Sequence, residues 1–341
     1  MNFQLTRKLG GIREYVALAG ILVALVLLFG ALNGRFLTAT TFGAIANRIP
    51  TLALAATGMT LVLIVGGIDL SVGSVLALSG AVLGVALVDW HWPFLACAAL
   101  AVVVGLVAGA VNGAIIVGVT VPPFIVTLGM MEMARGAAYL VTGSQTKYLG
   151  AAVEGLARPL GGTGLSGSFL LALLVIGLAQ LLLSSSVLGR WMFATGSNET
   201  ATRYSGIDPR PVKLSAYALA GAAAGLGAVC YASRLGASDP NAGVGLELSA
   251  IAAAVIGGTS LLGGRGSVIN TFFGVLIIAT LEAGLAQVGA SEPAKRLVTG
   301  AVIVLAVLAD VWRQRAAGET FPLWSRLLGG TKPRPAADEM K

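Results

Sequence analysis

Asp69 is the residue that most needs a chemical explanation, because it stands in Val65–Gly80, VGGIDLSVGSVLALSG, between apolar runs. A charge at the centre of a bilayer costs roughly 2.5–3.5 kcal/mol on insertion scales, so it is by default a candidate functional group. Its carboxylate can accept hydrogen bonds at the start of a helix, pair with an arginine in one state of a gate, or contact a substrate. The pathway or gate residues predicted from this stretch are Gly66, Gly67, Asp69, Ser71, Gly73 and Ser74.

A second stretch, Gly257–Gly266, is made mostly of glycine, serine and threonine and contains Arg265. It is either a tight turn at one membrane face, or a close-packed gate or partner-facing corner. It adds Gly257, Gly258, Thr259 and Ser260 to the candidate pathway residues.

Asn112 is a further candidate pathway residue, because an amide inside a membrane helix can bridge helices or line a pathway. Glu132 and Arg135 are three residues apart, and we expect them to pair on one helix face.

The polar loop Gly189–Lys213, GRWMFATGSNETATRYSGIDPRPVK, predicts a short helix of about two turns. Ser197 or Asn198 can cap its start, and Glu199 suits its first turn because acidic groups favour a helix N-terminus. Gly206 can supply the left-handed residue at its end. The alternative is a plain amphipathic loop. A stiff, capped helix would suit the docking of a partner protein.

Other kinds of site chemistry have no support in the residues. The chain has one histidine, so a Ser/His/Asp arrangement is not credible, and no cluster of metal ligands occurs. Cys97 and Cys230 both lie in apolar runs, which is typical of small core residues. The pattern Gly-x-x-x-x-Gly-Lys-Ser/Thr is absent, so we expect no ATP hydrolysis and no cofactor on this chain.

The elements that position these residues are predicted to be membrane helices. The 341 residues are 56% hydrophobic and 11% charged, with a mean hydropathy of +0.88, whereas soluble domains carry about 25% charged residues. Such a chain needs the bilayer as its solvent. The 47 glycines allow helices to approach closely. The net charge of +7 comes from basic residues that flank apolar runs, which indicates membrane orientation rather than nucleic-acid binding.

Apolar runs of near-spanning length predict an all-α polytopic membrane protein with about ten transmembrane helices and Gly-rich breaks; nine and eleven are the alternatives. The predicted spans are 15–32, 44–65, 70–88, 94–117, 122–141, 169–185, 214–231, 248–262, 268–288 and 296–312. Residues 15–32 are interpreted as a retained first helix rather than a signal peptide. We expect a transmembrane domain over 1–315 and a cytoplasmic, partly disordered tail over 316–341.

An even number of spans puts both termini on the same side. With the N-terminus inside, most of the 22 basic residues fall on the inner side, which supports cytoplasmic termini.

Three motifs carry a resemblance to a known family. The pattern Gly196-x-Asn198-Glu199-x-Ala201-x-Arg203-x-Ser205-Gly206-Ile207 resembles the cytoplasmic signature of ribose-type sugar permeases of ABC importers. Gly66–Ser74 and Glu247–Gly266 match two further hallmarks, in the family's order, and the resemblance runs from about residue 15 to residue 312. Thr200 and Thr202 stand where small apolar residues are frequent, and Ser249 stands where an aspartate is common.

The resemblance implies the transmembrane permease subunit of an ATP-driven importer for a monosaccharide, in the bacterial inner membrane. Its implied partners are a second permease copy, a cytoplasmic ABC ATPase and a periplasmic sugar-binding protein. Ribose is the sugar we expect, with xylose, arabinose, galactose and fructose as alternatives. The residues implied in ATPase coupling are Gly196, Asn198, Glu199, Ala201, Arg203, Ser205 and Gly206.

Two other classes of function are alternatives. One is an ATPase-independent secondary transporter or channel for a small polar solute, in which a docking helix between 190 and 213 has no obvious use. The other is a membrane-embedded enzyme, which lacks a nucleophile, a base and metal ligands in this sequence.

Overall fold

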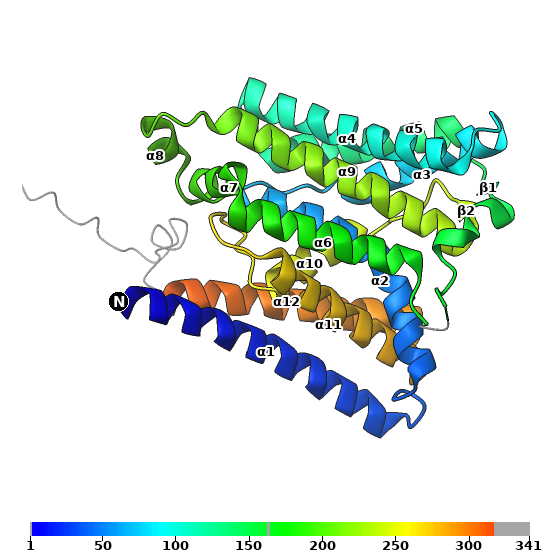
Figure 1. The fold of residues 1–341 in the computed structure, drawn as a ribbon, viewed down its shortest axis with the longest axis horizontal. Helices are drawn as coiled ribbons and strands as arrows, with labels where there is room; N and C mark the ends of the chain where they lie inside the picture. The colour runs from blue at the N-terminus through cyan, green and yellow to red at the C-terminus, as the bar shows by residue number, and fades with distance from the viewer. Residues whose placement is uncertain (1, 162–163, 317–341) are drawn as a thin grey trace, which may run out of the picture.

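The computed structural model describes residues 2–161 and 164–316 (Figure 1). A helix overlaps each of the ten predicted apolar runs. The predicted tail lies outside the described residues apart from Ala316. The helices at the predicted positions are α1 (Asn2–Leu32), α2 (Ala39–Ile64), α3 (Val72–Val88), α4 (Phe94–Val119), α5 (Pro123–Thr142), α6 (Gly167–Ser185), α9 (Pro209–Leu235), α10 (Leu246–Ile256), α11 (Val268–Gln287) and α12 (Glu292–Ala316).

The remaining elements are short. Helices α7 (Val187–Ser197) and α8 (Glu199–Tyr204) form the polar loop before α9, and η1 (Gly150–Ala152) and η2 (Glu154–Leu156) lie between α5 and α6. Strand β1 (Lys147–Tyr148) pairs antiparallel with β2 (Ala237–Ser238).

Seven of the described helices are long and apolar enough to cross a membrane. They are α1 (counted from Tyr15), α2, α4, α5, α6, α9 and α11. Helices α3 and α10 are apolar but only 17 and 11 residues long. The all-α membrane fold is therefore confirmed, and the predicted count of about ten spans is approximate.

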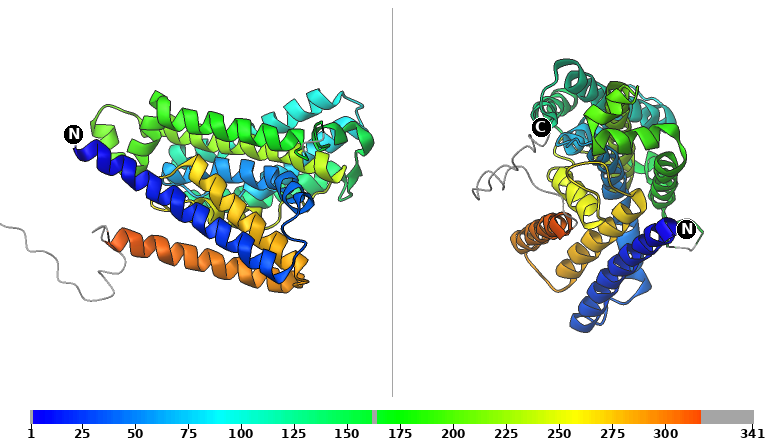
Figure 2. Two further views of the ribbon diagram at one scale, coloured as in Figure 1. Left: turned by 60° about the horizontal axis from the view of Figure 1, so that its bottom comes forward. Right: turned by 90° about the vertical axis from the view of Figure 1, so that its left-hand side faces the viewer.

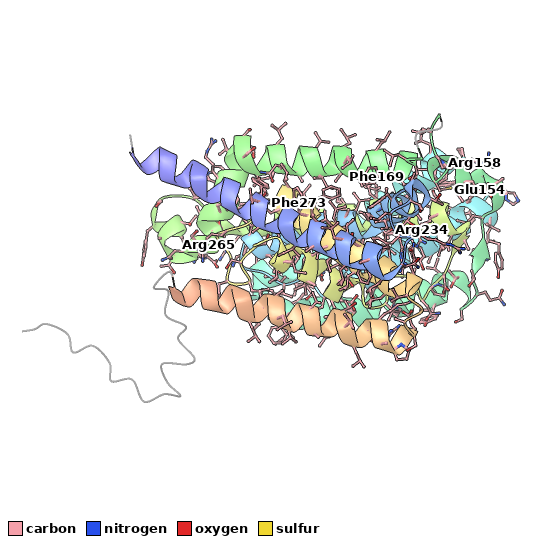
Figure 3. The ribbon with its side chains drawn as sticks, turned by 90° about the horizontal axis from the view of Figure 1, so that it is seen from below. Glu154, Arg158, Phe169, Arg234, Arg265 and Phe273 are labelled. Atoms are coloured by element: carbon pink, nitrogen blue, oxygen red, sulfur yellow. The ribbon has the colours of Figure 1, made fainter. Side chains whose placement is uncertain are left out.

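Both ends of the bundle are visible in the figures. The start of α1, helix α8 and the end of α12 lie at one end, whereas β1 and β2 lie at the other (Figure 1). Viewed down the bundle, α5, α10 and α12 line one side of the molecule and α6 lies on the opposite side (Figure 2, right). Arg265 lies at the α8 end, and Glu154 and Arg158 lie at the β1 end (Figure 3).

Helix starts follow from local capping chemistry. Asp208 caps α9 by accepting a hydrogen bond from the Arg210 backbone N–H, and Pro209 occupies the first helical position, where a missing N–H costs nothing. For this reason α9 begins at residue 209, five residues before the predicted start at 214. Side chains that cap other helices belong to Thr38, Ser166, Ser186 and Ser267.

Glycines bring α4 and α9 into backbone contact. A Cβ added at Gly109 would overlap the Tyr217 carbonyl oxygen, and one added at Gly221 would overlap the Gly105 carbonyl oxygen. An added Cβ at Gly225 would lie 2.6 Å from the Ala101 carbonyl oxygen. These contacts are of the small-residue kind by which membrane helices associate, as the glycine content predicts.

Two non-helical segments, 65–71 and 239–245, are packed between helices, although Gly66, Asn241 and Val244 are exposed. Segment 239–245 follows β2 and runs back along α3, because Ser238 packs against Gly84 and Gly243 packs against Gly73. Non-helical backbone at membrane depth must be buried in protein or border water. These two segments carry the polar residues described next.

Candidate pathway and coupling sites

The break before Asp69 is a Schellman motif at the end of α2. Gly66 has a left-handed φ of +77°, and its N–H donates to the Leu63 carbonyl at 2.9 Å. The Gly67 N–H donates to the Val62 carbonyl at 2.9 Å. This pattern uses a glycine at the left-handed position and satisfies carbonyls that the helix end leaves free. The two glycines therefore end α2 within the apolar stretch.

The Asp69 carboxylate is buried and hydrogen-bonded within the chain. Only 3% of the residue is exposed. Its Oδ1 accepts from the Ser71 N–H at 2.9 Å and from the Ser71 hydroxyl at 2.6 Å. The Asn112 side-chain amide, from α4, donates to the same hydroxyl at 2.9 Å. The structure therefore brings Asn112 together with Asp69 and Ser71, which were predicted from a different part of the sequence.

The N-cap of α3 is Ser71 rather than the predicted Asp69, and no side chain makes a cap hydrogen bond at the start of α3. Asp69 forms an Asx turn over Ser71, which is the N-cap of α3, and takes no part in an ion pair among the described residues. Nearby, the Thr127 hydroxyl donates to the freed Ile68 carbonyl at 3.2 Å. Gly73 packs on Gly243, and Ser74 is buried at the start of α3.

Two buried polar atoms beside this break have no hydrogen-bond partner among the described residues. They are Oδ1 of Asn112 and the hydroxyl oxygen of Tyr217, on α9. The Tyr217 side chain covers Gly67, since a Cβ added there would lie 3.0 Å from Cζ of the tyrosine ring. Buried polar atoms are normally paired with protein or water. The polar atoms around Asp69 are therefore buried among α3, α4 and α9, with two of them unpaired among the described residues.

The three sequence motifs meet at a backbone junction. The Gly264 N–H donates to the Ile64 carbonyl at 2.9 Å, and a Cβ added at Gly196 would overlap that carbonyl oxygen. A Cβ added at Gly263 would lie 2.8 Å from the Gly196 carbonyl oxygen and 3.0 Å from Cα of Gly66. The junction has no room for side chains at these positions. Gly263 and Gly264 were not among the predicted site residues, although their Gly-Gly-Arg-Gly context marked a tight turn.

The predicted capped helix is present as α8. Oδ1 of Asn198 accepts from the Ala201 N–H at 2.9 Å, and Gly206 has a left-handed φ of +83°. The Gly206 and Ile207 N–H groups donate to the Arg203 and Thr202 carbonyls, which is again a Schellman motif. The predicted local structure of this loop is therefore confirmed.

Most side chains of α8 are exposed. The side chain of Arg203 is 60% exposed and Tyr204 is 88% exposed, whereas Thr202 is buried. Glu199 forms ion pairs with Lys213 of α9 and, at 3.5 Å, with Arg203. Ala201 and Ser205 are also exposed. Helix α8 is therefore fixed to α9 at one point and presents most of its residues outward.

The stretch after α10 is a buried turn. Gly258 has a φ of +84°, and the Thr259 N–H donates to the Ala254 carbonyl at 2.9 Å. A Cβ added at Gly257 would lie 2.6 Å from the Asn270 carbonyl oxygen, so the turn packs directly on α11. The Ser260 N–H donates to the Arg265 carbonyl at 3.0 Å and closes the turn. Because the left-handed Gly258 ends the helix, α10 stops at residue 256, before the predicted end at residue 262.

The predicted pair of Glu132 and Arg135 is wrong. Arg135 donates through Nη1 to the carbonyls of Pro240 at 2.6 Å and Ala242 at 2.7 Å, and the described residues contain no Glu132–Arg135 salt bridge. Its partners belong to segment 239–245, which sequence reasoning missed. The signal was present, because an Asp-Pro-Asn-Ala-Gly run is typical of a turn.

Within the described residues, no group of three His, Cys, Asp or Glu side chains could hold a metal ion. The polar clusters found here hold backbone, shape helix ends and present hydrogen-bonding groups.

Comparisons with known proteins agree over most of the chain. Residues 40–307 match the family described as the branched-chain amino acid transport system permease component. The ribose import permease protein of Escherichia coli (strain K12) is 38% identical over 303 residues, which cover 86% of this chain and 92% of that protein. The ribose import permease protein of Bacillus subtilis (strain 168) is 39% identical over 295 residues, covering 85% and 90%.

A relative with a different printed substrate is also similar. The D-allose transport system permease protein of Escherichia coli (strain K12) is 35% identical over 300 residues, covering 85% of this chain and 89% of that protein. No solved structure matches the chain.

Proposed function

This chain belongs to the permease family of the branched-chain amino acid transport system, and from that premise we propose that it is the membrane subunit of an ABC importer for a monosaccharide. A permease component is a transport subunit and not an enzyme, so ATP hydrolysis belongs to a partner ATPase. The observation that carries the sugar assignment is the 35–39% identity to ribose and allose permeases over at least 85% of this chain. Ribose is the first sugar to test.

The chain is a multi-pass membrane protein, and we assign it to the bacterial inner membrane with both termini in the cytoplasm. In this orientation α8 faces the cytoplasmic ATPase, and β1 and β2 face the sugar-binding protein. Two copies form the pathway. A mass measurement that finds one permease chain per two nucleotide sites in the purified transporter would contradict this stoichiometry.

Helix α8 is proposed to receive the motion of the ATPase. It is short and capped at both ends, so it moves as one body, and its Glu199 is tied to α9 through Lys213. The preceding α7 ends at the Gly196 junction with α2 and with the turn after α10. A displacement of α8 would therefore act on three parts of the bundle through packed, rigid contacts.

Arg203 is the proposed docking residue on α8. Its ion pair with Glu199 is exposed, and exposed pairs of this spacing contribute only about 0.3–0.5 kcal/mol. Arg203→Ala should therefore leave the amount of permease in the membrane nearly unchanged. Its planar fork of donors suits carboxylates and backbone carbonyls at an interface, so we expect weaker ATPase association or hydrolysis that no longer follows sugar delivery.

Arg158→Ala is a matched control, because Arg158 pairs with Glu154 at the same spacing and is 69% exposed at the opposite end. The control should keep normal ATPase association, because Arg158 lies far from the proposed ATPase-facing end. If Arg203→Ala also assembles normally and its hydrolysis still tracks sugar delivery, Arg203 is not a coupling residue.

A further inference from the structure

One amide side chain of α6 does more than pack. Between Phe169 and Leu183 every residue of α6 is apolar or glycine except Gln180. An amide without a partner is costly in hydrocarbon, so a glutamine in a membrane helix normally bonds to a neighbouring helix. Gln180 was not among the predicted site residues, although it is the one polar side chain in that apolar run.

Gln180 caps the start of α11. Its Oε1 accepts from the Val268 N–H at 3.0 Å, the Ile269 N–H at 3.4 Å and the Ser267 hydroxyl at 3.3 Å. The first N–H groups of a helix have no acceptor within that helix. Ser267 accepts from the Asn270 N–H, so Gln180 supplies the acceptor for the two N–H groups before it. The beginning of α11 is therefore held by a side chain of a different helix.

Helices α6 and α7 form one rigid elbow, and α7 lies at the α8 end of α6 (Figure 1). Ser186 is both the C-cap of α6 and the N-cap of α7. Its hydroxyl donates to the Leu182 carbonyl at 2.7 Å and accepts from the Gly189 N–H at 2.9 Å. A Cβ added at Gly189 would lie 2.5 Å from the Leu183 carbonyl oxygen, so the bend has no room for a side chain.

The two arms of this elbow hold the same stretch of backbone. A Cβ added at Gly264 would lie 2.8 Å from Cα of Ser197, the last residue of α7. The other arm, α6, holds residues 267–269 through Gln180. Beyond Ser197 the chain passes through Asn198 directly into α8. The elbow therefore connects α8 to the start of α11.

On the basis of the proposed function, we propose that Gln180 is a positioning residue that makes α11 follow the ATPase-driven movement of α8. The Gly196 junction passes a displacement of α8 to α2 and to the turn after α10, and Gln180 passes it to α11. Hydrogen bonds to backbone N–H groups are directional, whereas apolar contact is not. The grip of Gln180 therefore resists sliding of α11 along α6, and it stays closed through the transport cycle.

Two variants separate the acceptor from the rest of the side chain. Gln180→Leu removes the acceptor and leaves an apolar residue that suits this helix. Gln180→Glu keeps an acceptor oxygen, which a helix N-terminus favours. Ser184→Ala is the matched control, because the exposed Ser184 hydroxyl bonds only to Leu181 and Ser185 of its own helix among the described residues.

The readout is the number of ATP molecules hydrolysed per ribose taken up by the transporter assembled with its ATPase and ribose-loaded binding protein. An average hydrogen bond corresponds to about fivefold in an equilibrium constant, so Gln180→Leu should raise this number by about that factor. Gln180→Glu and Ser184→Ala should stay close to wild type.

Three results would overturn the proposal. One is an unchanged number of ATP molecules per ribose in Gln180→Leu. Another is a Gln180→Leu protein that only accumulates less in the membrane, which would show a purely structural role. The third is a Gln180→Glu protein as uncoupled as Gln180→Leu, which would show that the acceptor is not what matters. A wild-type transporter that hydrolyses ATP but imports no ribose would instead count against the proposed function.

A reversible cross-link tests the grip without measuring sugar import. In a background with Cys97→Ala and Cys230→Ala, Gln180→Cys and Ile269→Cys are joined by a reducible bifunctional thiol linker. Ile269 is 37% exposed, and its backbone N–H survives the substitution. Stimulation of ATP hydrolysis by the binding protein should fall in the unlinked protein, return when the linker is added and fall again on reduction. A linked protein no better stimulated than the reduced one would show that α6 and α11 must separate, and would overturn the proposal.

Discussion

At Asp69, one carboxylate oxygen satisfies two donors of Ser71, and the hydroxyl of Ser71 in turn accepts from Asn112. Asn at position 69 can offer the same oxygen, so Asp69→Asn should keep most of the stability. Asp69→Ala leaves the buried Ser71 N–H without its acceptor, which costs about 1–3 kcal/mol. Thermal unfolding of the detergent-purified protein measures the difference.

Ser79→Ala is the control for that prediction, since the buried Ser79 hydroxyl has no partner among the described residues and its removal should cost little. An Asp69→Ala protein as stable and active as wild type would contradict the account of the break.

At this scale the sequence identifies exceptional residues but not their partners. Asp69 stands out because it is a charge between apolar runs. Its link to Asn112 depends on how α3 and α4 pack, which no local pattern reports. Arg135 shows the opposite error: helix spacing favours Glu132 as its partner, yet two carbonyls of a non-helical segment over 100 positions away bind it instead.

Among the elements, α8 depends on the backbone of Gly206. A residue with a Cβ pays roughly 1–2 kcal/mol in the left-handed conformation that Gly206 adopts. Gly206→Ala should therefore loosen the last turn of α8 and reduce the stimulation of ATP hydrolysis by sugar-loaded binding protein, without lowering membrane insertion. Gly177→Ala, on an open face of α6, is the control. Equal stimulation in both variants would contradict a coupling role for the α8 geometry.

The contact of α4 with α9 depends on Gly109. Val at this position would drive a side chain into the Tyr217 carbonyl, so Gly109→Val should separate the helices and reduce the yield of monodisperse protein in size-exclusion chromatography. Gly118→Val, on the same helix but in open space, should behave like wild type. A normal elution profile for Gly109→Val would show that α4 and α9 do not need this close approach.

Helix positions were predictable because hydropathy reports which residues avoid water. The exact ends of the helices were harder to predict, because they depend on the backbone conformation of individual glycines. The Gly-Gly pairs after α2 and α10 look alike in sequence, yet the left-handed residue is the first glycine in one, Gly66, and the second in the other, Gly258. Their similarity in sequence therefore does not extend to the same backbone register.

For the whole molecule, composition is enough to predict a helical membrane protein, and the family comparisons agree with that prediction. The meeting of the three motifs was not predictable from their spacing. Gly66, Gly196 and Gly264 come together only when α2, α7 and the turn after α10 are packed. That junction connects the proposed ATPase-facing helix to the break that holds Asp69.

The most direct test of the proposed function is sugar uptake into vesicles that contain this chain, its partner ATPase and the sugar-loaded binding protein. Labelled ribose is supplied outside and ATP inside. We expect accumulation only when the ATPase and ATP are both present, with vesicles containing an ATPase impaired in hydrolysis as the control. Ribose accumulation that continues without the ATPase would contradict the account and identify the chain as a carrier or channel that acts alone.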